Sequence, residues 1–159
     1  MGLITYDMEI SATIPPAKMF HAFVVDGDKI YPKILPQVFQ SVEIVEGDGG
    51  PGTIKNITFG EASQFKYAKH RVDALDKEKL TYSYSWIEGD ALMNIFEKIS
   101  HDVKIEAGPN GGSICKNTSR YYAIGDIQFT EEQIKDGKEK VLGVFKALEG
   151  YLLANPNAC

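Results

Sequence analysis

Cysteine is scarce in this chain of 159 residues, and long hydrophobic runs are missing. The two cysteines are Cys115, inside a strand-like run, and Cys159, the last residue, so no internal disulfide is favoured. No apolar run approaches the ~20 residues that a membrane-spanning helix needs. No basic segment followed by an apolar one marks a secretory signal. We therefore expect residence in the cytoplasm and no insertion into a membrane.

Patterns for binding metals and nucleic acids are also missing. The three histidines, His21, His70 and His101, lack the spacing of metal ligands, and neither H-x-x-x-H nor C-x-x-C occurs. The formal net charge of −5 disfavours strong binding to nucleic acid or to an anionic membrane. The sequence therefore predicts no metal, no cofactor and no nucleic-acid partner.

One stretch imitates a nucleotide-binding motif. It spells G-x-G-x-x-G, and its glycines are Gly47, Gly49, Gly50 and Gly52. A dinucleotide site needs a helix directly after such a loop, because the helix N-terminus holds the pyrophosphate. Residues 53–59 read instead as a strand. We therefore interpret the loop as a tight hairpin.

The composition, 43% hydrophobic and 25% charged, is typical of a globular protein. The length fits one domain over residues 1–159. A strand at 3–13 precedes two short helices at 17–24 and 29–34, and a long helix at 130–153 ends the pattern. Six further strands are expected at 42–46, 53–59, 65–75, 80–87, 95–106 and 113–122.

Turn residues, and no helix, separate these six strands, which favours an antiparallel meander over βαβ units. A single curved sheet of this kind has a concave face that another element must cover. The long helix is the only candidate in the sequence. The predicted class is therefore α+β.

The long helix carries one residue that does not suit a plain core. Thr130 and Gln133 form a capping-box pattern at its start. Lys138 then falls on the apolar stripe between Ile134 and Val141. A buried ammonium group needs a partner, so Lys138 either extends its charge to the helix edge or reaches water, a carboxylate or a ligand.

The same helix contains Gly137, Gly143 and Gly150. Each costs about 1 kcal/mol relative to alanine inside a helix. Three such residues indicate either that the helix bends or that space is left beside it.

Polar groups also interrupt the expected concave face. Tyr82, Tyr84 and Trp86 alternate with small polar residues and so point to one side. Glu97 and His101 lie on the otherwise apolar face of the strand at 95–106. Two interpretations remain open: a hollow that holds water or a ligand, and an ordinary aromatic core whose hydroxyl groups reach its rim.

Five segments carry a resemblance to a known family: residues 2–6, 44–55, 69–73, 82–90 and 149–156. They resemble the plant pathogenesis-related class 10 proteins, to which the major birch pollen allergen belongs, over essentially the whole chain. The resemblance implies the helix-grip fold, in which a seven-stranded antiparallel sheet wraps around a long C-terminal helix above two short helices. It also implies an internal cavity.

The resemblance further implies a monomeric carrier or reservoir in plant defence, and an allergen. The expected ligands are amphiphilic: flavonoids, cytokinins or other hormones, sterols and fatty acids. Trp86 and His101 stand where smaller or uncharged residues are usual, which implies a narrower pocket. The implied ligand-binding residues are Phe23, Tyr31, Phe59, Phe65, Tyr67, Tyr82, Tyr84, Trp86, His101, Lys138, Val141 and Leu142.

Three alternative functions accompany this resemblance. One is a ribonuclease, for which Lys55, Glu97, Glu149 and Tyr151 match the residues proposed in the family. Another is a condensing enzyme similar to norcoclaurine synthase, which uses a lysine, carboxylates and a tyrosine. The third is abscisic acid binding, although the Ser-Gly-Leu-Pro-Ala gate segment of the abscisic acid receptors does not occur here.

Overall fold

The computed structural model describes residues 3–61, 65–125 and 130–155, without the side chains of residues 91, 133, 134 and 136–138. Within these ranges the strands form a seven-stranded sheet in the order β1-β7-β6-β5-β4-β3-β2, with every neighbouring pair antiparallel. The predicted fold class is therefore confirmed. The strands are β1 (Leu3–Ala12), β2 (Phe39–Glu46), β3 (Ile54–Phe59), β4 (Tyr67–Asp76), β5 (Thr81–Gly89), β6 (Phe96–Ala107) and β7 (Ser113–Ala123).

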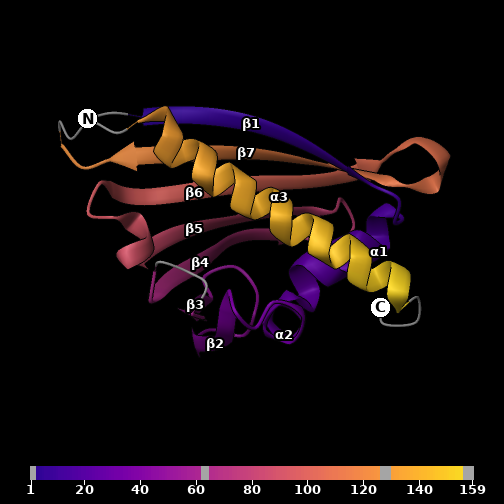
Figure 1. The fold of residues 1–159 in the computed structure, drawn as a ribbon, viewed down its shortest axis with the longest axis horizontal. Coiled ribbons are helices and arrows are strands. Elements are labelled where there is room, and N and C mark those ends of the chain that lie inside the picture. Colours follow the sequence, from indigo (N-terminus) through magenta and orange to yellow (C-terminus); the bar gives the residue numbers. More distant parts are fainter. Residues whose placement is uncertain (1–2, 62–64, 126–129, 156–159) are drawn as a thin grey trace.

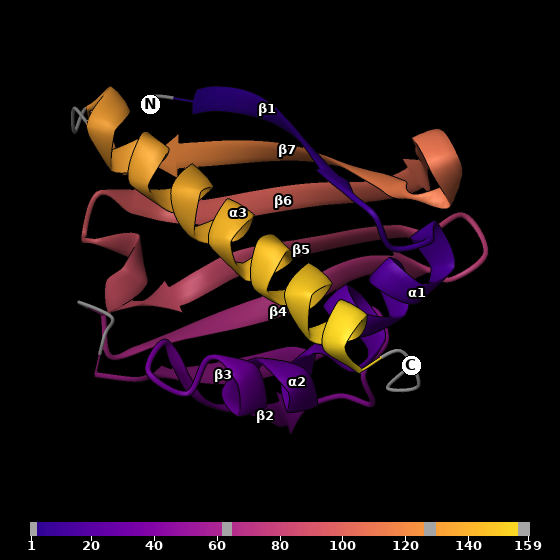
Figure 2. The ribbon, with the colours of Figure 1, turned by 45° about the vertical axis from the view of Figure 1, so that its right-hand side comes forward.

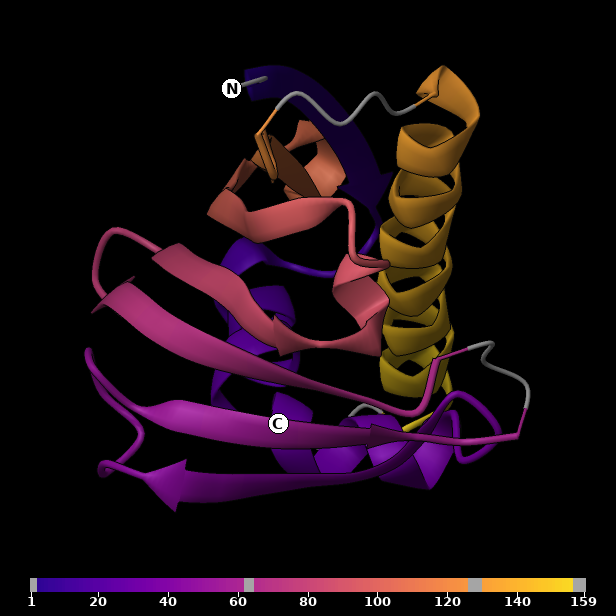
Figure 3. The same ribbon diagram turned by 90° about the vertical axis from the view of Figure 1, so that its left-hand side faces the viewer.

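The long helix α3 (Glu131–Ala154) crosses the sheet diagonally (Figures 1 and 2). Seen from the side, the sheet bends around one face, and α3 runs along that inner face (Figure 3). Phe145, Leu148 and Leu152 are spaced three and four residues apart and are almost completely buried. They anchor the C-terminal half of the helix in the larger hydrophobic core.

Two short helices lie beside the C-terminal end of α3 (Figures 1 and 2). The structure corrects the helix predicted at 17–24: α1 (Pro16–Phe20) continues into a π-helical turn (His21–Val25). This turn is wider because the Asp26 N–H donates to the His21 carbonyl, five residues back, at 2.8 Å. The second helix, α2 (Gly27–Ile34), begins two residues earlier than expected and contains Pro32. Two 3-10 turns (Asp90–Leu92 and Pro109–Gly111) complete the described helices.

One strand changes the direction of its side chains near its start. Phe96 pairs with Ala123, but the next pair is Lys98 with Tyr122, so β6 contains one extra residue. As a result Phe96 is buried and Glu97 is exposed. The prediction that Glu97 shares the inner face with His101 is therefore wrong, because a bulge interrupts the alternation.

The helices in the described ranges all lack the combination of length and apolarity that crossing a membrane demands.

Two of the expected helix glycines can be compared with the structure. A Cβ atom at Gly143 or Gly150 would meet no heavy atom within 4 Å outside the helix itself. Both glycines are exposed, so no other element packs against α3 at these two positions. The surroundings of Gly137, the third glycine, are not among those that the structure describes.

We expect Gly150→Ala to raise the free energy of unfolding by about 1 kcal/mol, because alanine has the higher helix propensity and meets no obstacle. Gly89→Ala is the matched contrast. Gly89 has a φ of 119°, and a Cβ there would lie 2.4 Å from the Tyr67 carbonyl oxygen, so this variant should be destabilised. Urea denaturation measures both changes. Destabilisation of Gly150→Ala would contradict the open surroundings described here.

Candidate functional site

A cavity of about 470 Å³ lies between the concave face of the sheet, α3, α2 and the π-helical turn. Aromatic and aliphatic side chains form most of its wall. The lining residues are Phe23, Val24, Asp28, Tyr31, Leu35, Val38, Phe39, Val42, Lys55, Ile57, Phe59, Phe65, His70, Tyr82, Tyr84, Trp86, Met93, Ile99, His101, Tyr121, Lys140, Val141, Gly143 and Val144.

Most of the residues predicted to bind ligand lie in this wall, although their role as ligand contacts stays a prediction. The structure brings together the alternating set from β5 with residues from the π-helical turn, α2, β3, β6 and α3. The predicted residues in the wall are Phe23, Tyr31, Phe59, Phe65, Tyr82, Tyr84, Trp86, His101 and Val141.

Two other predicted residues, Tyr67 and Leu142, are not among the described lining residues. Tyr67 precedes the fully buried Ala68 in β4, so it points to the opposite side, where its hydroxyl donates to Glu88 at 3.2 Å. Leu142 is 40% exposed on the outer side of α3. The side chain of Lys138 lies outside the described residues.

Sequence reasoning did not assign Lys55, His70, Asp28 and Lys140 to the wall. Lys55 follows Thr53 and precedes Ile57 at two-residue steps, and all three are buried, so alternation along β3 could have located it. His70 likewise shares the phase of the buried residues Ala68 and Val72 in β4. Asp28 could not be found in this way, because its contact with the sheet spans 27 residues of sequence.

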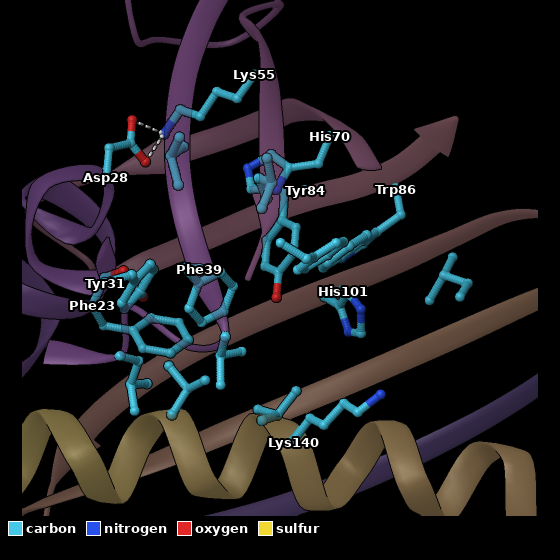
Figure 4. Close-up of a pocket in the computed structure, with 18 of the residues that line it drawn as sticks. Phe23, Asp28, Tyr31, Phe39, Lys55, His70, Tyr84, Trp86, His101 and Lys140 are labelled. Atoms are coloured by element: carbon cyan, nitrogen blue, oxygen red, sulfur yellow. Dashed lines mark hydrogen bonds and ion pairs between the residues drawn. The ribbon is translucent and has the colours of Figure 1, made fainter. Parts of the chain in front are cut away.

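Lys55 and Asp28 form a buried ion pair at one side of the cavity (Figure 4). The Lys55 Nζ lies 3.0 Å from Oδ1 and 2.9 Å from Oδ2 of Asp28. The lysine side chain is only 8% exposed, so removing the carboxylate would leave an uncompensated charge. The pair therefore supplies polar atoms to the wall without adding net charge.

Three rings pack against one another, at tilted angles, across neighbouring strands on the concave face. The Tyr84 ring lies between the rings of His70, 5.0 Å away, and His101, 4.9 Å away. His101 Nδ1 is hydrogen-bonded to the Ser119 hydroxyl on β7 at 2.7 Å. The Tyr84 hydroxyl points toward the cavity (Figure 4). Periodicity predicted Tyr84 on this face, but the contact with His70 depends on the register between β4 and β5.

Burial keeps both imidazoles neutral. It lowers the pKa of His101 to about 4. It also lowers the pKa of His70 to about 3, with the positive charge of Lys55 and the proximity of His101 acting in the same direction. Burial raises the pKa of Tyr82 and Tyr84 well above the ordinary value, so both phenols stay protonated. At neutral pH these groups therefore offer hydrogen bonds and no charge.

The four residues matched to a ribonuclease do not contact one another. Lys55 is paired with Asp28 inside the cavity, and Glu97 is exposed at the start of β6. Glu149 accepts a hydrogen bond from the Thr13 backbone at 2.7 Å, and the Tyr151 hydroxyl lies 3.2 Å from the Lys33 ammonium. Among the described residues, these side chains therefore have separate partners.

The glycine-rich segment connects β2 to β3, which pair as antiparallel neighbours, so it is the hairpin that the sequence predicted. Gly47, Gly49 and Gly52 all have positive φ values. The Gly49 N–H donates to the Thr53 hydroxyl at 2.8 Å and thereby closes the loop on itself.

Comparison with known proteins establishes the family. The model of the "Pathogenesis-related protein Bet v 1 family" matches residues 1–155. Major allergen Pru ar 1 from Prunus armeniaca is 55% identical over 158 residues, which is 99% of each chain. The crystal structure of Ara h 8.0201 has a TM-score of 0.88 at 44% identity and is matched over 97% of this chain and 100% of its own. The chain therefore belongs to the Bet v 1 family.

A more distant likeness concerns an enzyme. Norcoclaurine synthase from Thalictrum flavum, solved with dopamine and hydroxybenzaldehyde, has a TM-score of 0.74 at 19% identity. The match covers 97% of this chain and 88% of the synthase chain. At this identity the two proteins share the fold, and no common chemistry follows.

We expect the free energy of unfolding to decrease as the pH falls from 6.5 towards 4. Between these values the unfolded chain, with an ordinary histidine pKa near 6.5, binds more protons than the folded chain, in which the pKa of His101 is about 4. Protonation therefore favours unfolding, by on the order of 3 kcal/mol for this residue.

Urea denaturation across this pH range measures the effect in the wild type and in His101→Gln, which retains a hydrogen-bonding group beside Ser119. The difference at pH 7.5 isolates the structural cost of the substitution, because the histidine is neutral there in both states. The free energy of unfolding of His101→Gln should depend less on pH than that of the wild type. If the two curves are parallel, His101 is not the source of the pH dependence.

Proposed function

We propose that this protein binds amphiphilic small molecules in its internal cavity and acts as a carrier or reservoir for them. The observation that carries the proposal is a cavity of about 470 Å³ with mostly aromatic and aliphatic walls and a few buried polar groups. Small-molecule sites in proteins have this character. The volume suits a molecule of two or three fused rings.

The energetics support an occupied cavity. By cavity-creation data from another protein, a dry void of this size would cost on the order of 10 kcal/mol, which is comparable to the whole stability of a typical domain. Water reduces that cost because Lys55, Asp28 and His70 offer polar contacts. A guest that fills the apolar part removes more apolar surface from water and stabilises the fold.

Gly143 supports the same proposal from the helix side. It lines the cavity, and no heavy atom outside the helix lies within 4 Å of where its Cβ would be. The side chain of a larger residue at this position would occupy part of the cavity volume. Glycine at position 143 therefore costs helix stability, because its helix propensity is low, but it leaves free the part of the cavity that a side chain would fill.

The candidate ligands are flavonoids, cytokinins and other hormones, sterols and fatty acids, as the family resemblance implied. We also propose that the protein is an allergen, because its relative Pru ar 1 is a major allergen. The strand and turn at positions 43–48 are exposed and offer a surface for antibodies. Binding of immunoglobulin E from donors sensitised to Pru ar 1 tests this part.

We expect wild-type protein to bind the uncharged probe N-phenyl-1-naphthylamine and to increase its fluorescence. Gly143→Leu should weaken that binding at least tenfold, because the new side chain enters the cavity. Gly150→Leu is the matched control: it makes the same change at a second exposed glycine of the same helix, one that is not among the described lining residues, and should leave affinity unchanged.

Fluorescence titration gives the dissociation constants, and displacement by a flavonoid or a cytokinin identifies competing ligands. If wild type fails to enhance the probe, or if Gly143→Leu binds it as tightly as wild type does, the cavity is not the binding site.

A further inference from the structure

Two neighbouring side chains in the cavity wall have polar atoms without partners. Among the described residues, no group has close hydrogen-bond geometry to Trp86 Nε1 or to either ring nitrogen of His70, although all three atoms are buried. The Tyr84 hydroxyl lies near enough to the indole for the indole N–H to lower the pKa of that phenol, against the larger effect of burial. Several other polar side chains of the wall have partners within the protein. Lys55 is bonded to Asp28, His101 to Ser119, and Tyr31 to the carbonyl of Phe23.

The positions of Trp86 and His70 are set by strand pairing and ring contacts. The two residues are direct partners across β4 and β5, and their ring centroids are 6.1 Å apart. The indole is stacked on Phe59 at 6.0 Å with an interplanar angle of 3°. The imidazole packs against Tyr84 at 5.0 Å. The two side chains are therefore held next to each other in the cavity wall (Figure 4).

This pair has a defined hydrogen-bonding capacity. The indole can only donate, whereas a neutral imidazole has one donor and one acceptor. Buried donors without acceptors are unfavourable, so a molecule that reaches this wall gains most when it brings an oxygen atom to it. An apolar molecule of the same shape would leave the donors unsatisfied and would bind less tightly.

The charges around the pair favour an uncharged guest. The ammonium of Lys55 is already compensated by Asp28, and His101 has its pKa lowered by burial as His70 does. Lys140 lies on α3, across the cavity from His70, with its ammonium over the Phe65 ring at 4.7 Å (Figure 4). A carboxylate placed at the His70 wall would lose its hydration. The cations of the described lining, Lys55 and Lys140, already lie against Asp28 and the Phe65 ring.

We propose that Trp86 and His70 form the specificity-determining subsite of this cavity, and that they select an uncharged, planar aromatic molecule through its carbonyl or hydroxyl oxygen. The indole N–H donates to that oxygen, and the imidazole donates to it or accepts from an adjacent hydroxyl. This inference rests on the proposed function. It ranks neutral oxygenated aromatics above fatty acids and other carboxylates as ligands of this chain.

Three rigid probes of similar shape separate the contributions: 9-fluorenone, which carries a carbonyl acceptor, fluorene, which lacks it, and 9-fluorenone-4-carboxylate, which adds a charge. Isothermal calorimetry gives the affinities. Trp86 is the single tryptophan of the chain, so its fluorescence reports independently whether a probe reaches this wall. We expect fluorenone to bind wild type about tenfold tighter than fluorene and at least tenfold tighter than the carboxylate.

The variants Trp86→Phe and His70→Phe keep an aromatic ring at each position and remove the ring nitrogens, and Trp86→Phe also replaces the fused indole by a smaller ring. Each should reduce the preference for fluorenone over fluorene severalfold. The affinity for fluorene serves as the reference, because loss of apolar contact weakens both probes alike. Tyr67→Phe is the matched control: it removes a polar group from an aromatic residue outside the cavity, so the preference should stay at the wild-type value.

The inference is overturned if wild type binds fluorene as tightly as fluorenone, if both phenylalanine variants keep the full preference, or if the carboxylate binds at least as tightly as fluorenone. Binding of N-phenyl-1-naphthylamine in those cases leaves the proposed function standing. Failure of every probe, including N-phenyl-1-naphthylamine, would remove the proposed function as well.

Discussion

The contact on which the structure depends is the packing of the C-terminal part of α3 against the core. Phe145, Leu148 and Leu152 are buried there together with Met19 and Phe20 of α1. One turn earlier, Val141 and Val144 pack against the same core and also line the cavity, as Gly143 does. The buried contacts contribute hydrophobic stabilisation, which offsets the cost of the hollow beside them.

Alternation and helical periodicity predicted the elements of this fold and much of the cavity wall. Tyr82, Tyr84 and Trp86 lie where a two-residue period places them. Periodicity could not predict the bulge that turns Glu97 outward, since one inserted residue leaves no distinct mark in the sequence. Nor could it predict contacts between distant segments, such as that of Lys55 with Asp28, which depend on how α2 docks on β3.

The sequence left open whether the aromatic face is a hollow or a solid core, and the structure contains both arrangements. Tyr82 belongs to the buried cluster around Phe145 and also lines the cavity. The polar groups on this face also fall into two kinds, those with a partner in the protein and those without one. His101 is satisfied within the sheet by Ser119, whereas neither ring nitrogen of His70 has a hydrogen-bond partner among the described residues. A buried polar group is therefore part of the fold or part of a binding surface according to whether the protein itself supplies its partner.

The position of α3 in the chain also governs when the cavity comes into being. A ribosome synthesises all seven strands before this helix, so the element that covers the concave face is the last to be made. Because a domain generally folds as a unit, the sheet and α3 come together once the whole chain is available. The cavity therefore forms at the end of synthesis, and a guest is enclosed only when α3 docks.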